Sequence, residues 1–184
     1  MNIFFISDTH FGHEAPYTKF MLKDGCTFSR PHGSAAAGDQ AMEENWNKIV
    51  KPSDKVYHVG DIAMSKKYLP ILDRLNGEKV LIRGNHDLEK ASTYLKYFKD
   101  VRGVHQFDGL LISHIPVHPD SLARWGFNVH GHLHTNRVQR EVEVSNDGSL
   151  SVYRVENDPR YFNVSVEQIN YTPISLEQIK RHKP

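Results

Sequence analysis

The chain has 184 residues, of which 39% are hydrophobic and 24% are charged. This length and apolar content predict one globular domain, residues 1–184, with a substantial core. The formal net charge is +1 with histidine neutral, which excludes a strong overall attraction to nucleic acid or to a membrane surface. The single cysteine, Cys26, cannot form an intramolecular disulfide, and we find no signal-peptide pattern and no apolar run of transmembrane length. We therefore expect a cytoplasmic protein without membrane partners.

The first half of the chain alternates apolar, strand-like runs with helical patterns. We expect strands at residues 2–7, 55–59 and 80–82, and helices at residues 41–50, 66–75 and 88–98. Asp39 is the candidate N-cap of the first helix, and Pro70 falls in the first turn of the second, where proline is tolerated. Residues 14–38 have little periodicity, so we expect either a lid over a site or a disordered insert there.

From residue 101 onward the pattern favours strands. We expect strands at residues 101–107, 110–112, 127–129, 138–144, 149–155 and 161–166, turns at Asp108-Gly109 and Asn146-Asp147-Gly148, and a short helix at residues 120–124. Ser175 and Gln178 form a capping-box pattern that opens a C-terminal helix. The order of elements predicts an α/β (α+β) sandwich, in which helices flank two mixed β-sheets.

Polar side chains with metal-ligand chemistry follow the apolar runs at the points where the strands end. They are Asp8 and His10, Asp61, Asn85 and His86, His114, and His132 with His134. Because ligands bind at the carboxyl ends of strands in open α/β sheets, we expect these side chains to share one pocket. Polar groups gathered without partners are costly, and divalent cations would remove that cost.

The number and type of these ligands favour two metal ions. The set is too large for one tetrahedral ion, and it mixes imidazole nitrogen with carboxylate and amide oxygen but contains no thiolate. Manganese is our first expectation, with iron, zinc, cobalt or nickel as alternatives. Two metals about 3.5–4 Å apart can clamp the attacking and leaving oxygens of phosphoryl transfer. We therefore expect a dinuclear centre at the strand ends.

Five separate motifs resemble the signature of the calcineurin-like metallophosphoesterase superfamily. They are Asp8-x-His10, Gly60-Asp61, Gly84-Asn85-His86-Asp87, His114 and Gly131-His132-x-His134. The opening motif and the stretches at residues 163–167 and 173–176 also resemble a subgroup of small bacterial and phage phosphoesterases. The resemblance thus extends over most of the chain.

The resemblance implies a role for each of these residues. Asp8, His10 and His134 would hold one metal, Asn85, His114 and His132 would hold the other, and Asp61 would bridge the pair. A hydroxide that bridges the metals would attack phosphorus. His86 would protonate the leaving oxygen, and Asp87 would orient His86 through a hydrogen bond.

Other residues near the motifs have two possible readings. His13 and Arg83 are candidate substrate contacts, although each could equally be an ordinary loop residue. Arg30 could likewise meet a phosphate or simply be solvated. We expect His58 to be a hydrogen-bonded residue of the core, and His130 to be structural, because it alternates away from the ligand stretch.

The expected substrate is a small phosphate ester. The Ser/Thr protein phosphatases of the superfamily carry Asp-Arg-Gly shortly after Gly-Asp, whereas this chain has Ile62-Ala63-Met64-Ser65. We therefore expect hydrolysis of a phosphodiester or a small phosphomonoester rather than of a phosphoprotein. One alternative is a metal-dependent nuclease acting on DNA or RNA ends, which the near-neutral charge does not favour. The other is a non-catalytic binding scaffold on the same fold, which would be expected to have lost ligands.

Overall fold

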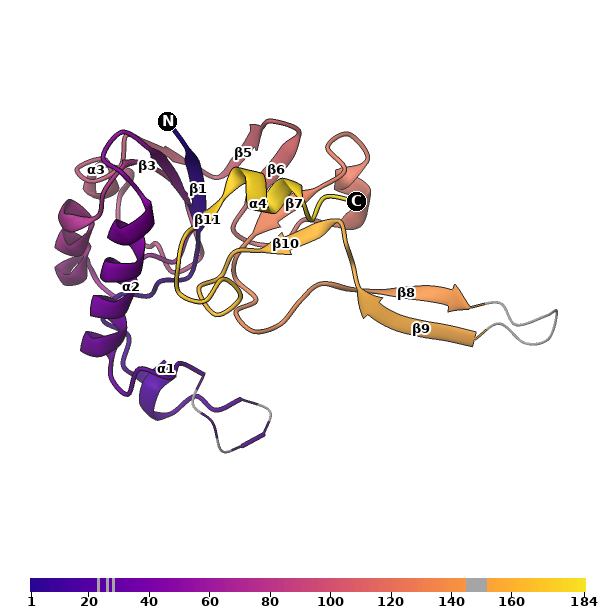
Figure 1. Ribbon diagram of the computed structural model, residues 1–184, viewed down its shortest axis with the longest axis horizontal. Coiled ribbons are helices and arrows are strands. Elements are labelled where there is room, and N and C mark those ends of the chain that lie inside the picture. Colours follow the sequence, from indigo (N-terminus) through magenta and orange to yellow (C-terminus); the bar gives the residue numbers. More distant parts are fainter. Residues whose placement is uncertain (23, 26, 28, 145–151) are drawn as a thin grey trace.

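The computed structural model describes residues 1–22, 24–25, 27, 29–144 and 152–184. The turn expected at Asn146-Asp147-Gly148 lies outside these residues. Figure 1 shows a layer of helices, a first β-sheet beside it and a second sheet beyond, with one hairpin extending away from the body. This arrangement confirms the predicted sandwich of two mixed sheets with helices.

The first sheet is parallel except at one edge. Its strands, in spatial order, are β11 (Ile174–Ser175), β1 (Ile3–Ile6), β2 (Lys55–His58), β3 (Glu78–Ile82) and β4 (Asp100–Arg102). Strands β1 to β4 pair in parallel, and β11 runs antiparallel to β1. Since β1, β2 and β3 run in the same direction, the loops that follow them leave the sheet at the same edge.

The second sheet combines a hairpin with parallel strands. Its spatial order is β10 (Tyr161–Asn163), β7 (Asn128–His130), β6 (Leu110–Ser113) and β5 (Val104–Phe107). Strands β5 and β6 are antiparallel, and the turn at Asp108-Gly109 has positive φ at both residues, as the predicted hairpin requires. Strands β8 (Gln139–Val144) and β9 (Val152–Asn157) form the hairpin that extends from the body in Figure 1.

The prediction of a single strand at residues 101–107 is wrong. The chain is divided at Gly103 into β4, which pairs with β3 in the first sheet, and β5, which pairs with β6 in the second. A β-carbon at Gly103 would meet no atom of the described residues within 4 Å, so close packing does not require a glycine where the chain passes between the sheets. The apolar pattern runs through this point because both strands contribute to the interior.

A second crossing joins the two sheets beside the strand ends. After β10, the chain at Val164 accepts a hydrogen bond from the N–H of Ser7 (2.9 Å) and donates one to the carbonyl of His130 (2.7 Å). The N–H of Val166 then donates to the carbonyl of Ser7 (3.1 Å). These bonds hold the end of β1 next to the end of β7.

Alternate side chains of the first sheet pack into two apolar clusters. In β1, Phe4 and Ile6 face the helices, whereas Phe5 faces the second sheet. Trp46 is buried on the helix side, and Phe127 is buried between the sheets. Burying one such side chain contributes about 1.5–3 kcal/mol. The strands are therefore firmly held, and so are the positions of the residues that follow them.

The helices are α1 (Ala15–Thr18), α2 (Ala35–Ile49), η1 (Lys66–Arg74), α3 (Ala91–Tyr94), η2 (Pro119–Leu122) and α4 (Leu176–Lys180). Ser175 and Gln178 form the predicted capping box at the start of α4. Among the described helices, none is long and apolar enough to cross a membrane.

Three helix predictions need correction. Helix α2 begins at Ala35 and is capped by the side chain of Ser34, so Asp39 lies within the helix and does not cap it. The second helix, η1, is a 3-10 helix with Pro70 inside it, and proline cannot donate the hydrogen bond that an α-helix needs there. The pattern at residues 88–98 yields only the single turn α3, because Leu88 and Leu95 are exposed.

Candidate metal centre

The loops at the strand ends share an unusual backbone conformation. Positive φ angles occur at five of the predicted ligands: Asp8 (58°), His10 (45°), Asp61 (56°), His132 (69°) and His134 (50°). This conformation is unfavourable for residues other than glycine, and it clusters at functional sites in proteins. Neighbouring loops hold it in place, because the N–H of Asp8 donates to the carbonyl of Gly60 (3.0 Å) and that of His10 to the carbonyl of Asp61 (3.1 Å).

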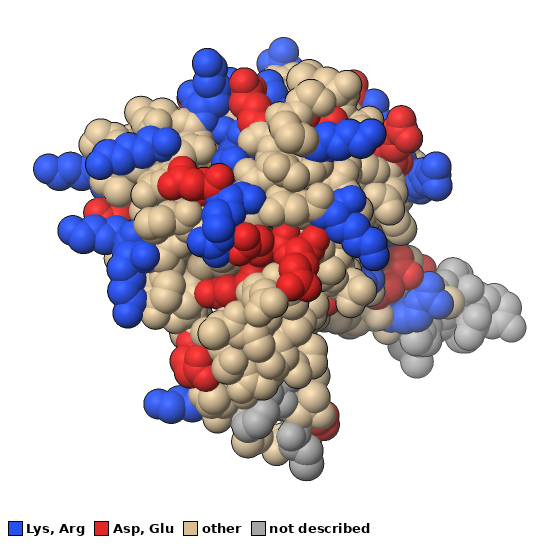
Figure 2. Space-filling model, turned by 60° about the vertical axis from the view of Figure 1, so that its left-hand side comes forward, with Lys and Arg blue, Asp and Glu red and all other residues tan. Residues whose placement is uncertain are grey.

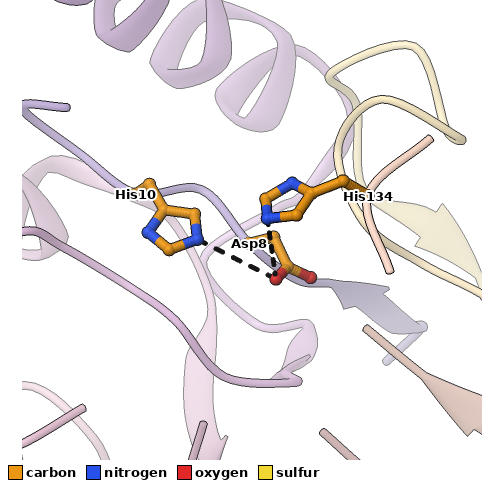
Figure 3. Close-up of side chains that lie close together, drawn as sticks. All are labelled: Asp8, His10 and His134. Atoms are coloured by element: carbon orange, nitrogen blue, oxygen red, sulfur yellow. Dashed lines mark ion pairs between the residues drawn. The ribbon is translucent and has the colours of Figure 1, made fainter. Parts of the chain in front are cut away.

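Asp8, His10 and His134 form a first ligand group, drawn in Figure 3. The Oδ1 atom of Asp8 lies 4.0 Å from Nε2 of His10 and 3.8 Å from Nε2 of His134. The other oxygen, Oδ2, accepts hydrogen bonds from the hydroxyls of Ser7 (2.6 Å) and Ser165 (2.9 Å) and from the N–H of His132 (2.9 Å). Oδ1 is buried and has no hydrogen-bond partner among the described residues. It is thus free to bind a cation between the two imidazoles.

Asn85, His114 and His132 form a second ligand group around one amide oxygen. The Oδ1 atom of Asn85 lies 2.9 Å from Nε2 of His114 and 2.9 Å from Nδ1 of His132. Asp61 lies between the two groups: its Oδ2 is 3.5 Å from Nε2 of His10 and 3.4 Å from Nε2 of His114. One carboxylate therefore faces both groups, as a bridging ligand would.

The hydrogen bonding of His114 shows that a cation fits this site. Its Nδ1 lies 2.8 Å from the carbonyl oxygen of Val59, which can only accept, so Nδ1 carries a proton. Its Nε2 faces the side-chain oxygens of Asn85 and Asp61; burial lowers the pKa of His114, but the hydrogen bond to Asp61 outweighs that effect and raises it. A cation at this point, either a proton on Nε2 or a metal ion bound to the deprotonated nitrogen, would satisfy all three atoms.

The electrostatics also favour metal binding. Burial lowers the pKa of His10 to about 3, despite the opposing effect of Asp61, so its ring is neutral and able to bind metal at pH 7. Burial raises the pKa of Asp61, but the hydrogen bond and charge of His114 outweigh that effect and lower it to about 2. Divalent transition metals require neutral imidazoles, so His114 and His134, whose pKa values hydrogen bonds to Asp61 and Glu167 raise despite burial, would release a proton when a metal binds.

His86 lies at the open side of the centre. Its side chain is exposed, its ring centroid is 5.4 Å from that of His10, and its N–H donates to Oδ1 of Asp61 (2.8 Å). The ring therefore stands beside the ligands without taking part in either group.

In the part of the chain that it describes, the structure does not show the hydrogen bond by which Asp87 was expected to orient His86, and that role stays a prediction. Its carboxylate is buried and accepts hydrogen bonds from the backbone N–H groups of Asp61 (2.9 Å), Ile62 (3.0 Å) and Gly84 (2.8 Å). These are loop contacts, and no hydrogen bond joins Asp87 to the ring of His86 among the described residues. Asp87 thus ties the loop after β3 to the loop after β2. Sequence reasoning looked for a partner next to it in the chain, whereas its partners come mainly from another strand end.

The two candidate substrate contacts have different surroundings. His13 is half-buried, with its ring centroid 5.6 Å from that of His10, so it lies at the edge of the first ligand group. Arg83 donates from Nε and Nη2 to the carbonyls of Asp87 and Glu89 (2.7 Å each). These hydrogen bonds stabilise the loop that carries His86. A contact between Arg83 and a phosphate stays a prediction.

His58 and His130 are buried, as expected of structural residues. Nε2 of His58 lies 3.0 Å from the hydroxyl of Thr9, and Nδ1 of His130 lies 2.8 Å from the carbonyl of Gly131. Burial lowers their pKa values to about 3 and about 4 respectively. Both rings are therefore neutral at pH 7.

Two residues contact the first ligand group in ways that the sequence did not indicate, and one of them, Arg30, is not solvated as one of its two readings had it. Glu167 accepts a hydrogen bond from Nδ1 of His134 (3.1 Å), and Arg30 is 1% exposed and donates to the carbonyls of Asp8 and Thr9. Burial raises the pKa of Glu167, but His134 and Arg30 outweigh that effect and lower it to about 2. Glu167 lies within residues 163–167, which resemble the phosphoesterase subgroup, but no pattern in the neighbouring sequence indicated that it would bind His134 and Arg30.

The fold and the residues at the strand ends define a class of metal-dependent phosphoesterases. A family model for the calcineurin-like phosphoesterase superfamily domain matches residues 1–168. The chain belongs to the calcineurin-like phosphoesterase superfamily, as its motifs predicted.

Two relatives cover nearly the whole chain. An uncharacterised protein of Methanocaldococcus jannaschii is 35% identical in an alignment of 183 positions that covers 96% of this chain and 88% of the relative. The crystal structure of an Aquifex aeolicus protein of unknown function aligns with a TM-score of 0.64 and 25% identity over 98% of both chains. Both similarities cover nearly the whole chain, and the description of neither relative names a substrate.

Proposed function

We propose that this protein is a dinuclear metal-dependent phosphoesterase that hydrolyses a phosphodiester or a small phosphomonoester. The observation that carries the proposal is the position of Asp61, whose Oδ2 faces His10 at 3.5 Å and His114 at 3.4 Å. One carboxylate shared by two ligand groups is the arrangement expected for two neighbouring cations. Membership of the phosphoesterase superfamily supports the reaction class.

The residues of the first and second ligand groups would hold one divalent ion each, with Asp61 contributing to both. When bound, two such ions supply a water of lowered pKa and neutralise the charge that develops on the phosphoryl oxygens. Manganese suits this nitrogen and oxygen set best in our proposal, and iron, zinc, cobalt and nickel also suit it.

The protein's own residues would complete the chemistry. His86 is exposed beside the centre, and imidazole is the commonest general acid in enzymes, so it would donate a proton to the leaving oxygen. His13, at the edge of the first ligand group, would contact the substrate. Asp87 would act indirectly, because it fixes the loops that present Asp61 and His86.

A small ester is favoured over a nucleic acid. On the face drawn in Figure 2, lysine and arginine side chains are interspersed with acidic ones rather than gathered in a continuous stripe. A protein that tracks a nucleic-acid backbone needs a groove of positive charge. A nuclease remains the second candidate, and it would show a steep fall in affinity with added salt.

The test is hydrolysis of bis-p-nitrophenyl phosphate and of p-nitrophenyl phosphate by metal-stripped protein refilled with manganese. We expect turnover that needs metal, is faster on the diester, and is lost in Asp61→Asn. The variant His86→Ala should lose turnover but keep its metal. Two bound metals without turnover of either ester would support the scaffold alternative instead, and loss of metal in His86→Ala would make His86 a ligand.

A further inference from the structure

We propose that Arg30 is a positioning residue that builds the first ligand group (Asp8, His10 and His134) and leaves the second group (Asn85, His114 and His132) unaffected. Arg30 belongs to the stretch for which the sequence suggested a lid or a disordered insert. Its side chain is instead among the most deeply buried of the described residues, with 1% exposed. A guanidinium is buried only where its charge and its donors are satisfied.

Two of its donors fix the strained loop after β1. Nη2 of Arg30 donates to the carbonyl of Asp8 (2.5 Å), and Nη1 donates to the carbonyl of Thr9 (2.7 Å). Those two peptide groups lie between the ligands Asp8 and His10, which both have positive φ. The two hydrogen bonds from the planar guanidinium thus stabilise an unfavourable backbone conformation, and this conformation directs the side chains of Asp8 and His10 toward the same point.

The third donor reaches the remaining ligand of the group. Nε of Arg30 donates to Oε1 of Glu167 (2.9 Å), and the same oxygen accepts from Nδ1 of His134 (3.1 Å). Because Nδ1 of His134 is engaged in this way, Nε2 is the nitrogen left to bind a metal, and it lies 3.8 Å from Oδ1 of Asp8. One buried cation therefore connects all three residues of the first ligand group.

The side chains of the second ligand group are oriented by other contacts, although the backbone N–H of His132 donates to Asp8. The Nδ1 atom of His114 donates to the carbonyl of Val59, and Asn85 is held between two imidazoles. The guanidinium of Arg30 donates to Asp8, Thr9 and Glu167, and among the described residues no hydrogen bond joins it to Asn85, His114 or His132. Loss of the guanidinium should therefore weaken one metal site and not the other. This inference rests on the proposed two-metal function.

The test is manganese binding to the whole, metal-stripped chain in the absence of any substrate. Isothermal titration gives the affinity and number of sites, and electron paramagnetic resonance distinguishes coupled pairs of Mn²⁺ from isolated ions. We expect wild type to bind two ions that give a coupled spectrum. In Arg30→Lys, which keeps the charge but loses the fork, one site should keep its affinity and the other should weaken by about 10–100-fold, with an isolated-ion spectrum at one equivalent.

Two further variants make the result decisive. Arg74→Lys changes another arginine that binds a glutamate, but on the surface, so both sites should remain as in wild type. Glu167→Gln should reproduce the loss at one site, and it decides the matter if Arg30→Lys does not fold. Unchanged binding at both sites, or equal weakening of both, would overturn the positioning role. Wild-type protein that binds fewer than two ions would overturn the proposed function itself.

Discussion

Replacing Asp87 by asparagine tests what this buried side chain does. Its carboxylate oxygens accept three backbone N–H groups, from Asp61, Ile62 and Gly84. Asparagine keeps the shape but places an NH₂ group opposite at least one N–H donor, and an unsatisfied buried donor costs about 1–3 kcal/mol. Burial raises the pKa of Asp87, so the neutral amide also avoids part of the cost of burying a charge. We expect the free energy of unfolding to fall by about 1–2 kcal/mol.

Thermal unfolding of the metal-free protein, followed by circular dichroism, measures this loss. In a domain of this size 1 kcal/mol corresponds to about 2–4 °C, so Asp87→Asn should lower Tm by about 2–8 °C. The same decrease should appear in a His86→Ala background, because Asp87 acts on the backbone of the loops. Asp73→Asn changes an exposed aspartate and should leave Tm unchanged.

A different pattern would refute this reasoning. If Asp87→Asn kept the wild-type Tm, lost activity, and had no further effect once His86 was replaced, Asp87 would act through the ring of His86. That result would support the role inferred from the family resemblance over a purely structural one.

Two more predictions concern the surroundings of the site. Burial raises the pKa of Asp39 from 3.8 to about 6, so the folded chain holds this proton more tightly and stability falls as pH rises from about 4 to 6. Asp39→Asn keeps an acceptor for the N–H of Gly12 and should raise the free energy of unfolding by about 1 kcal/mol at pH 7, after allowance for partial exposure, but by little at pH 4. Urea unfolding at both pH values measures this difference, and an equal gain at the two pH values would contradict the prediction. A β-carbon on Gly84 would lie 2.5 Å from the backbone nitrogen of Asp61, so Gly84→Ala should force the two loops apart and lower both Tm and manganese affinity. In the control Gly103→Ala, the added β-carbon meets only open space. Similar Tm and affinity values for the two variants would show that the loops can separate at little cost.

The proposed metal ligands could be named from the sequence because their signal is local. Each lies directly after a short apolar run, and buried strands of one sheet bring their ends to the same edge whatever the rest of the fold does. The turn at Asp108-Gly109 and the capping box at Ser175 were predictable for the same reason, since their chemistry is complete within four residues.

Only the tertiary structure decided which residues support those ligands. Arg30 and Glu167 are separated by 137 positions, and neither carries a local pattern that indicates the other. Asp87 stands beside His86 in the chain, but its donors include two residues of the loop after β2. Periodicity reports which residues turn toward the interior, whereas a buried polar group is satisfied by whichever donor the packed chain brings within about 3 Å. The proposed ligands of this protein could therefore be read from its sequence, but the hydrogen bonds that hold them in position could not.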